Sequence, residues 1–275
     1  MELAPGVHSL HVPMKGTFFL RKYPPNVYLV IDGDGVLIDS GYGNDASVRP
    51  RLEYLKEVGN PRITHIILTH PHPDHMGGAE RIQKATGAKI IIHEEDAEVA
   101  NNAFEDTRVG ETFRGGAVVR VGSIELELVH TPGHTHGHTC VLRRDDRALF
   151  TGDHILGTGT TAVSPDRGDM AKYIESLRKL QEMDISVLYP GHGQPVKEPQ
   201  RKIKELIDHR MEREKQILSL LEQGVDNVEG MVREIYPELD RDLIPAAWGQ
   251  VQVHLVKLEQ EGRVEVNSGE RYRLK

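Results

Sequence analysis

The chain carries a dense set of metal-ligand side chains within one short stretch. His70, His72, Asp74 and His75 fall within six positions, directly after the apolar run 66–68. Imidazole and carboxylate groups are the side chains that hold zinc and similar divalent metals. Alternate residues of an extended segment face the same way, so His70 and His72 can bind one metal while Asp74 and His75 bind a second. A loop of solvated histidines is the competing interpretation, which four ligand-type residues at this spacing disfavour.

Three more ligand-type residues each follow a short apolar run and lie among glycines. They are His134 in a Pro-Gly-His turn, Asp153 in a Gly-Asp turn and His192 in a Pro-Gly-His-Gly turn. Each pattern predicts a strand followed by a turn, and glycine lets the backbone approach a metal closely. Strand ends that deliver ligands to one edge of a sheet are what a two-metal hydrolase needs. The preceding apolar runs are residues 124–129, 148–150 and 185–188.

The order H-x-H-x-D-H, Pro-Gly-His, Gly-Asp, Pro-Gly-His-Gly resembles the motifs of the metallo-β-lactamase superfamily, over roughly residues 7–200. The resemblance implies an α/β fold, the αββα sandwich, in which outer helices cover two sheets. It also implies two divalent metal ions as cofactors, with zinc as the default and iron or manganese as alternatives. By position it assigns His70, His72 and His134 to the first metal, Asp74, His75 and His192 to the second, and Asp153 to a bridge between them.

Such a centre would act as a hydrolase. Two metals about 3.5–4 Å apart can hold a bridging hydroxide, polarise a substrate oxygen and lower the pKa of bound water toward ~7. Asp74 is our candidate for the proton acceptor and donor. His138, Thr160 and Thr161 are candidate substrate contacts, although His138 can instead fix the tautomer of a ligand and the threonines can be turn residues. The centre attacks carbonyl carbon and phosphorus equally well, so it does not select the substrate.

The composition indicates an ordinary globular chain of one or two domains, with 275 residues, 38% hydrophobic residues and a mean hydropathy of -0.45. The net charge of -8 implies no general attraction to nucleic acid or anionic membranes. No apolar run approaches the roughly 18 residues of a membrane span, and no signal-peptide pattern follows Met1. Cys140 is the only cysteine, which fits a reducing compartment and a buried thiol. We therefore predict a cytoplasmic protein.

The apolar spacing predicts mixed strands and helices up to residue 200 and a different pattern beyond it. Residues 1–200 are expected to form the hydrolase domain and residues 201–275 a winged-helix-like domain. Expected strands are residues 7–12, 27–31, 35–38, 64–68 and 89–92, and expected helices are 48–58, 77–86, 94–101 and 170–183. In the C-terminal part, we expect a long helix from Pro199, helices 228–235 and 248–261, and a hairpin of strands 264–266 and 272–274.

A hydrolase domain followed by a winged helix is similar to the β-lactamase-like protein 2 branch of the superfamily, some of whose members are endoribonucleases. The branch also resembles thioester hydrolases. The resemblance therefore implies either single-stranded RNA or a small acyl thioester, lactone or related ester as substrate. A nucleic-acid-binding regulator with a vestigial site is a third hypothesis, which the intact ligand set disfavours. The oligomeric state stays open.

The charge of the C-terminal part argues against a nucleic-acid clamp. Residues 201–275 carry 13 Lys/Arg against 15 Asp/Glu, whereas a phosphate-binding module should be basic. We therefore favour a structural role in packing, dimerisation or covering the active site. Because all seven ligand-type residues precede Pro199, we expect metal binding to survive removal of this part.

Overall fold

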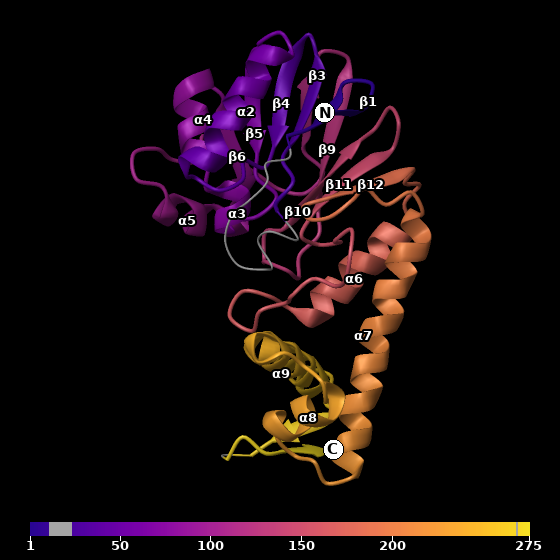
Figure 1. Ribbon diagram of the computed structural model, residues 1–275. Coiled ribbons are helices and arrows are strands. Elements are labelled where there is room, and N and C mark those ends of the chain that lie inside the picture. The colour runs from indigo at the N-terminus through magenta and orange to yellow at the C-terminus, as the bar shows by residue number, and fades with distance from the viewer. Residues whose placement is uncertain (11–23, 268) are drawn as a thin grey trace. The chain divides into compact units, whose positions relative to one another are not determined.

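The computed structural model describes residues 1–10, 24–267 and 269–275. The chain forms two compact units, each built from more than one stretch of sequence (Figure 1). The structure groups residues 161–183 with the C-terminal helices, whereas the boundary expected at residue 200 assigned them to the hydrolase domain. The first unit comprises Met1–Thr131, Gly137–Thr160 and Asp184–Pro199, and the second comprises Pro132–His136, Thr161–Met183 and Gln200–Lys275.

The first unit contains two β-sheets. The seven-stranded sheet has the order β1-β2-β3-β4-β5-β6-β7, and the five-stranded sheet has the order β12-β11-β10-β9-β8. Strands β4 to β7 run parallel to one another, as do β11 and β12. The strands are β1 Glu2–Ala4, β2 Val7–Ser9, β3 Tyr28–Asp32, β4 Asp34–Ile38, β5 Ile63–Ile67, β6 Lys89–His93, β7 Glu111–Phe113, β8 Val118–Val121, β9 Ile124–His130, β10 Thr139–Arg143, β11 Ala148–Gly152 and β12 Val187–Pro190.

The central strands of the seven-stranded sheet, β3 to β6, are buried on both faces. Helices α2 (Asp45–Glu57), α4 (Ala79–Thr86) and α5 (Glu94–Ala103) lie along its outer face (Figure 1). Ile66 packs in the core beneath these helices, whereas its neighbour Ile67 packs in the core shared with the five-stranded sheet. Two buried faces explain why the run before the histidine cluster is continuously apolar rather than alternating.

The second unit contains four helices, one 3-10 turn and a hairpin within its described residues. Its core joins Ile217 and Leu221 of α7 to Met231 of α8 and to Val251 and Leu255 of α9. The expected helices and hairpin of a winged helix are therefore present. Among the described residues, no helix combines the length and apolar character that a membrane span requires. The elements are α6 Met170–Gln181, α7 Pro199–Glu222, α8 Val228–Ile235, η1 Arg241–Leu243, α9 Ile244–Gln260, β13 Val264–Val266 and β14 Tyr272–Leu274.

Several element ends differ from those expected. Helix α2 begins before residue 48 because the side chain of Asn44 accepts a hydrogen bond from Ser47 N and caps it. Helix α9 begins at Ile244, four residues early, because Pro245 fits the first turn of a helix. The end of the strand expected at Val12 lies outside the described residues.

Candidate metal centre

The ligand-type residues of the first unit lie at one edge of its sheets. Because β11 and β12 are parallel, Asp153 and His192 follow strands that end at the same edge. Strand β10 is antiparallel to β11, so its first residue, Thr139, lies at that edge too. The N–H of Thr139 donates to the carbonyl oxygen of Thr69 at 2.9 Å. This bond ties the five-stranded sheet to the loop that carries His70.

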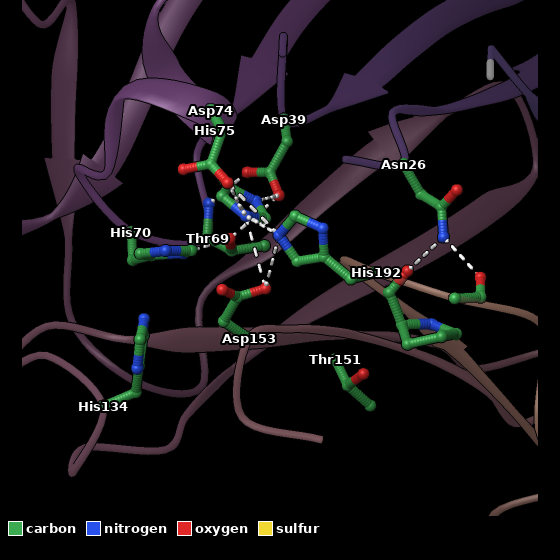
Figure 2. A network of polar contacts seen from close by, with 12 residues as sticks. Asn26, Asp39, Thr69, His70, Asp74, His75, His134, Thr151, Asp153 and His192 are labelled. Atoms are coloured by element: carbon green, nitrogen blue, oxygen red, sulfur yellow. Dashed lines mark hydrogen bonds and ion pairs between the residues drawn. The ribbon is translucent and has the colours of Figure 1, made fainter. Parts of the chain in front are cut away.

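Six of the seven ligand-type residues belong to the first unit and form two groups there, and Figure 2 labels all of the six except His72. Within each group, the candidate ligand atoms lie within 4.8 Å of one another. The pairing expected for the histidine cluster agrees with this grouping, since His70 falls with His72 and Asp74 with His75. The first group contains His70, His72 and Asp153, and the second contains Asp74, His75 and His192.

The second pair does not lie on an extended segment, although the alternation of side chains expected from the sequence requires one. Asp74 and His75 lie on a short helix, α3 (Pro73–Met76), which Pro73 opens at its first turn. The helix expected over residues 77–86 therefore begins only at α4, after Gly77 and Gly78. The directions of the Asp74 and His75 side chains are therefore set by helix geometry and not by the alternation of a strand.

The second group has the spacing of a tetrahedral metal site. The Nε2 atoms of His75 and His192 lie 3.2 Å apart. Asp74 Oδ2 is 3.2 Å from Nε2 of His192 and 3.7 Å from that of His75. Asp153 Oδ1 is 3.3 Å from Nε2 of His75 and 3.5 Å from that of His192. Ligands about 2.0–2.1 Å from a tetrahedral zinc lie about 3.3–3.4 Å apart, so this donor set fits a small divalent ion.

A buried hydrogen-bonded chain fixes the orientation of two histidines (Figure 2). Nδ1 of His75 lies 2.7 Å from Oδ2 of Asp39, so it must donate to that carboxylate, and Nε2 is then the candidate ligand atom. The hydroxyl of Thr69 also donates to Asp39 Oδ2, at 2.9 Å. Having given its proton to Asp39, the hydroxyl can only accept from Nδ1 of His70, 2.9 Å away. His70 is thereby held with Nε2 as its candidate ligand atom as well.

Asp39 contacts the candidate site through Thr69 and His75, and it was not predicted from the sequence. Only 2% of it is exposed, and it adopts a left-handed backbone conformation with φ of 61°. Asp and Asn tolerate that conformation better than most residues, and it turns the carboxylate back toward Thr69 and His75. The one signal that the sequence offered was the position of Asp39 directly after the strand β4. In the structure, β4 pairs in parallel with β5, and β5 leads into the histidine cluster.

Asn26 and Tyr28 hold the loop that carries His192. The amide of Asn26 donates to the carbonyl oxygens of Pro190 (2.9 Å) and Gly193 (2.8 Å), and the hydroxyl of Tyr28 donates to that of Pro190 at 2.8 Å. From the sequence, a strand was expected over residues 27–31, and neither Asn26 nor Tyr28 was assigned a role at the site. A Cβ on Gly191 would lie 2.7 Å from Asp153 Oδ1 and 2.7 Å from His75 Cε1. This close approach explains the glycine before His192.

The carboxylates dominate the electrostatics of the second group. Burial by itself would lower the pKa of His75, but Asp153, Asp39 and Asp74 raise this pKa well above its ordinary value. The pKa of His192 is also raised, because Asp153 and Asp74 outweigh burial. Burial would raise the pKa of Asp74, yet its histidine neighbours lower it. A divalent cation would satisfy these carboxylates in place of protons on the imidazoles.

The remaining predicted site residues lie in different surroundings. His134 belongs to the second unit, where its Nδ1 lies 2.8 Å from the carbonyl oxygen of Ala162. His138 is fully buried with Nδ1 2.9 Å from the hydroxyl of Thr131, which favours a supporting role over direct substrate contact. Thr160 is exposed, whereas Thr161 is buried. A substrate contact of these threonines stays a prediction.

A third group of candidate ligands lies elsewhere in the first unit. His93, Glu95 and His130 offer atoms within 4.8 Å of one another. The rings of the two histidines stack with centroids 3.9 Å apart and planes at 14°, so their in-plane lone pairs run side by side instead of converging. Nδ1 of His93 accepts the N–H of Glu95 at 3.3 Å and caps α5. Stacking and capping account for this group without a metal.

The chain is similar to known proteins over both parts. Residues 20–192 match the family described as Metallo-beta-lactamase superfamily, and residues 228–271 match the Beta-lactamase associated winged helix domain. A Beta-lactamase-like protein 2 homolog of Drosophila melanogaster is 35% identical, with 88% of this chain and 84% of that protein covered. The Atrochrysone carboxyl ACP thioesterase AgnL7 of Paecilomyces divaricatus is 31% identical, with 94% and 77% covered.

Structural comparison agrees over the whole chain. A crystal structure of a metallo-β-lactamase family protein from Thermus thermophilus aligns with 100% of both chains covered, 25% sequence identity and a TM-score of 0.79. The α/β fold and the C-terminal winged helix expected from the sequence are confirmed. The chain belongs to the metallo-β-lactamase superfamily of hydrolases and carries a C-terminal β-lactamase-associated winged helix.

Proposed function

We propose that this protein hydrolyses small acyl thioesters or related esters at a centre of two divalent metals. The spacing of the second group carries the metal part of the proposal, because its three donor atoms and Oδ1 of Asp153 lie as the ligands of one ion would. The imidazole and carboxylate donors suit zinc, and they also suit iron and manganese. The proposed ligands are His70, His72 and His134 for one ion and Asp74, His75 and His192 for the other, with Asp153 shared.

Chain connectivity supports His134 as the third ligand of the first ion. The loop that carries it leaves the first unit after Thr131 and re-enters at Gly137. The backbone N–H of Thr131 donates to the carbonyl oxygen of His138 at 2.9 Å, which pins both ends of the loop beside the edge that carries His70. A five-residue loop cannot extend far from that edge. Because Nδ1 of His134 donates to Ala162 O, a metal would bind this ring through Nε2.

When bound, two such ions would activate water and polarise the oxygen of a substrate. Among the chain's own residues, we propose Asp74 as the group that accepts and returns a proton. Its side chain is 22% exposed, against 14% for Asp153, so water and substrate can reach it. Its lowered pKa keeps the carboxylate ionised and able to act as a base near neutral pH.

Relatives and charge favour an ester over RNA as the substrate. A relative that aligns with 94% of this chain is named as an ACP thioesterase. A phosphodiester strand is anionic, and the net charge of -8 gives it no general attraction to this chain. Single-stranded RNA remains the second candidate, because the resemblance to β-lactamase-like protein 2 extends through the winged helix.

The packing of the winged helix also disfavours a nucleic-acid clamp. In a helix-turn-helix pair the second helix enters the major groove, and α9 holds that place after α8 here. Within the second unit, α9 is partly covered by the segment before α6, since Gln250 Nε2 donates to Val163 O at 2.9 Å. Cations of this unit are paired as well, as in Lys257 with Glu214 at 2.7 Å and Arg271 with Asp226 at 2.5 Å.

A metal analysis combined with a substrate panel tests the proposal. Protein purified with zinc, iron or manganese should bind about two ions per chain, and His70→Ala should deplete one of them. The loaded protein should then hydrolyse an acyl thioester faster than a lactone or a single-stranded RNA. Protein that binds no added metal would refute the hydrolytic centre. RNA cleavage without thioester hydrolysis would keep the centre but replace the proposed substrate.

Asp39→Asn tests the support of the second ion. Asparagine fits the same left-handed backbone, but its NH2 group donates where the carboxylate accepted. His75 would then have to accept at Nδ1 and carry its proton on Nε2, which cannot bind a metal in that form. We expect affinity for one ion to fall by about 10–100-fold, measured by competition with a chelator. Asp34→Asn, at the other end of the strand β4, is the control and should leave both ions bound. Equal metal affinities of the two variants would contradict the role of Asp39.

A further inference from the structure

Three consecutive backbone carbonyls of the second unit each accept a hydrogen bond from a different side chain. Arg210 of α7 donates to Thr161 O at 2.6 Å, and Gln250 of α9 donates to Val163 O at 2.9 Å. Between them, the carbonyl oxygen of Ala162 lies 2.8 Å from Nδ1 of His134. The carbonyl that orients the His134 ring is therefore flanked on both sides by carbonyls that the C-terminal helices hold.

The two flanking side chains also hold each other. Arg210 Nη1 donates to Oε1 of Gln250 at 3.0 Å, which leaves the amide of Gln250 turned with its NH2 group toward Val163. Only 2% of Arg210 is exposed, and its guanidinium lies 5.2 Å from the centroid of the Tyr173 ring. The pair thus spans α7, α9 and α6 as one fixed assembly.

Stability alone does not explain a buried arginine at this place. Taking a guanidinium out of water is costly, and buried charged groups are often replaceable by apolar residues without loss of stability. Two nitrogens of Arg210 donate hydrogen bonds, one to a backbone carbonyl and one to a side-chain amide oxygen. What this arrangement provides is a fixed position for residues 161–163, and the middle residue of that stretch faces His134.

The turn that carries His134 is fixed from its other side by α6. Asp169 N donates to Gly133 O, and Ser176 Oγ donates to Pro132 O, both at 2.9 Å. A Cβ at Gly133 would lie 2.3 Å from the Cα of Tyr173, so the turn is in direct contact with α6. Tyr173 in turn lies under the guanidinium of Arg210. Both supports of His134 therefore lead to Arg210.

We infer that Arg210 and Gln250 are positioning residues for His134, so that the C-terminal helices form part of the support of the first metal. The inference rests on the proposed role of His134 as a ligand. A carbonyl that accepts from Nδ1 fixes both the tautomer and the orientation of a metal-binding imidazole. The expectation that metal binding survives loss of residues 201–275 is revised accordingly, because those residues supply Arg210 and Gln250.

Gln250→Ala and Arg210→Ala in the full-length chain test the inference. Gln252→Ala on the same helix is the matched control, and Val251→Ala, which removes core volume from α9, controls for lost stability. Affinity for each ion is measured by zinc titration against a colorimetric chelator. We expect one ion to bind about 10–100-fold more weakly in Gln250→Ala and Arg210→Ala, while the second ion and both controls keep wild-type affinities.

A second readout needs neither metal nor activity. Long-range proton–nitrogen NMR correlations of metal-free protein should show His134 with its proton on Nδ1 in the wild type and in Val251→Ala. In Gln250→Ala the ring should become a mixture of tautomers. If folded Gln250→Ala keeps two tight ions and a single tautomer, the inference is wrong while the two-metal proposal stands. If the wild type binds fewer than two ions, both fail together.

Discussion

Asp153→Ala is expected to abolish turnover and to weaken the binding of both metal ions. Asp153 is grouped with His70 and His72, and its Oδ1 also lies 3.3 Å from Nε2 of His75 and 3.5 Å from that of His192. One carboxylate therefore faces both candidate sites. Its loss should cost more than the roughly 100-fold that removal of an outer hydrogen-bond partner costs a metal site.

Metal content and single-turnover hydrolysis measure this outcome. Asp184→Ala is a suitable control, because its exposed carboxylate pairs with Arg147 at the surface in a bond that contributes little. That variant should keep both ions and full activity. Asp153→Ala protein that retains both ions and most of its activity would show that this carboxylate does not join the two sites. A folded variant is expected, since removal of Asp153 also relieves repulsion from Asp74.

The sequence predicted the ligand-type residues because their chemistry is visible in the residue types. A histidine in a Pro-Gly turn after an apolar run is recognisable as a candidate metal ligand from the sequence. The apolar run also predicts where the strand ends. Asp39 is also a ligand-type residue, but no such motif surrounds it. A single aspartate after a strand is most often a turn residue. The role of Asp39 depends on β4 lying beside β5, a pairing that only the structure supplies.

The grouping of residues 161–183 could not be predicted for a related reason. The apolar stripe of α6 indicates that one face is buried, and Tyr173, Ile174, Leu177 and Leu180 are indeed buried. A stripe does not say which partner covers it. Likewise, Arg210 and Gln250 lie on helices whose patterns indicate packing alone, and their hydrogen bonds to a backbone segment 49 and 87 residues away have no local signal.

Asp74→Asn separates proton transfer from metal binding. Asparagine keeps the shape and an oxygen that can face His192, but it has no carboxylate to accept a proton. If Asp74 is the proton acceptor, kcat should fall by about 10²–10⁴-fold, while the ion held by the group of His70 and His72 stays bound. The loss should persist at saturating metal, because it arises from the missing base and not from an empty site.

The pH profile gives the decisive comparison for Asp74. Its lowered pKa keeps the wild-type base ionised through neutral pH, so activity should fall only as acid protonates it, below the ordinary range of an aspartate. Asp74→Asn should lack this acidic limb, whereas Asp74→Glu should restore a limb with part of the rate, because a longer carboxylate can still accept a proton. Rates for Asp74→Asn within about tenfold of wild type, below the loss expected for an acid–base residue, would assign proton transfer to another group. Asp74 would then be a ligand alone, and its 22% exposure would reflect only an open side of the second site.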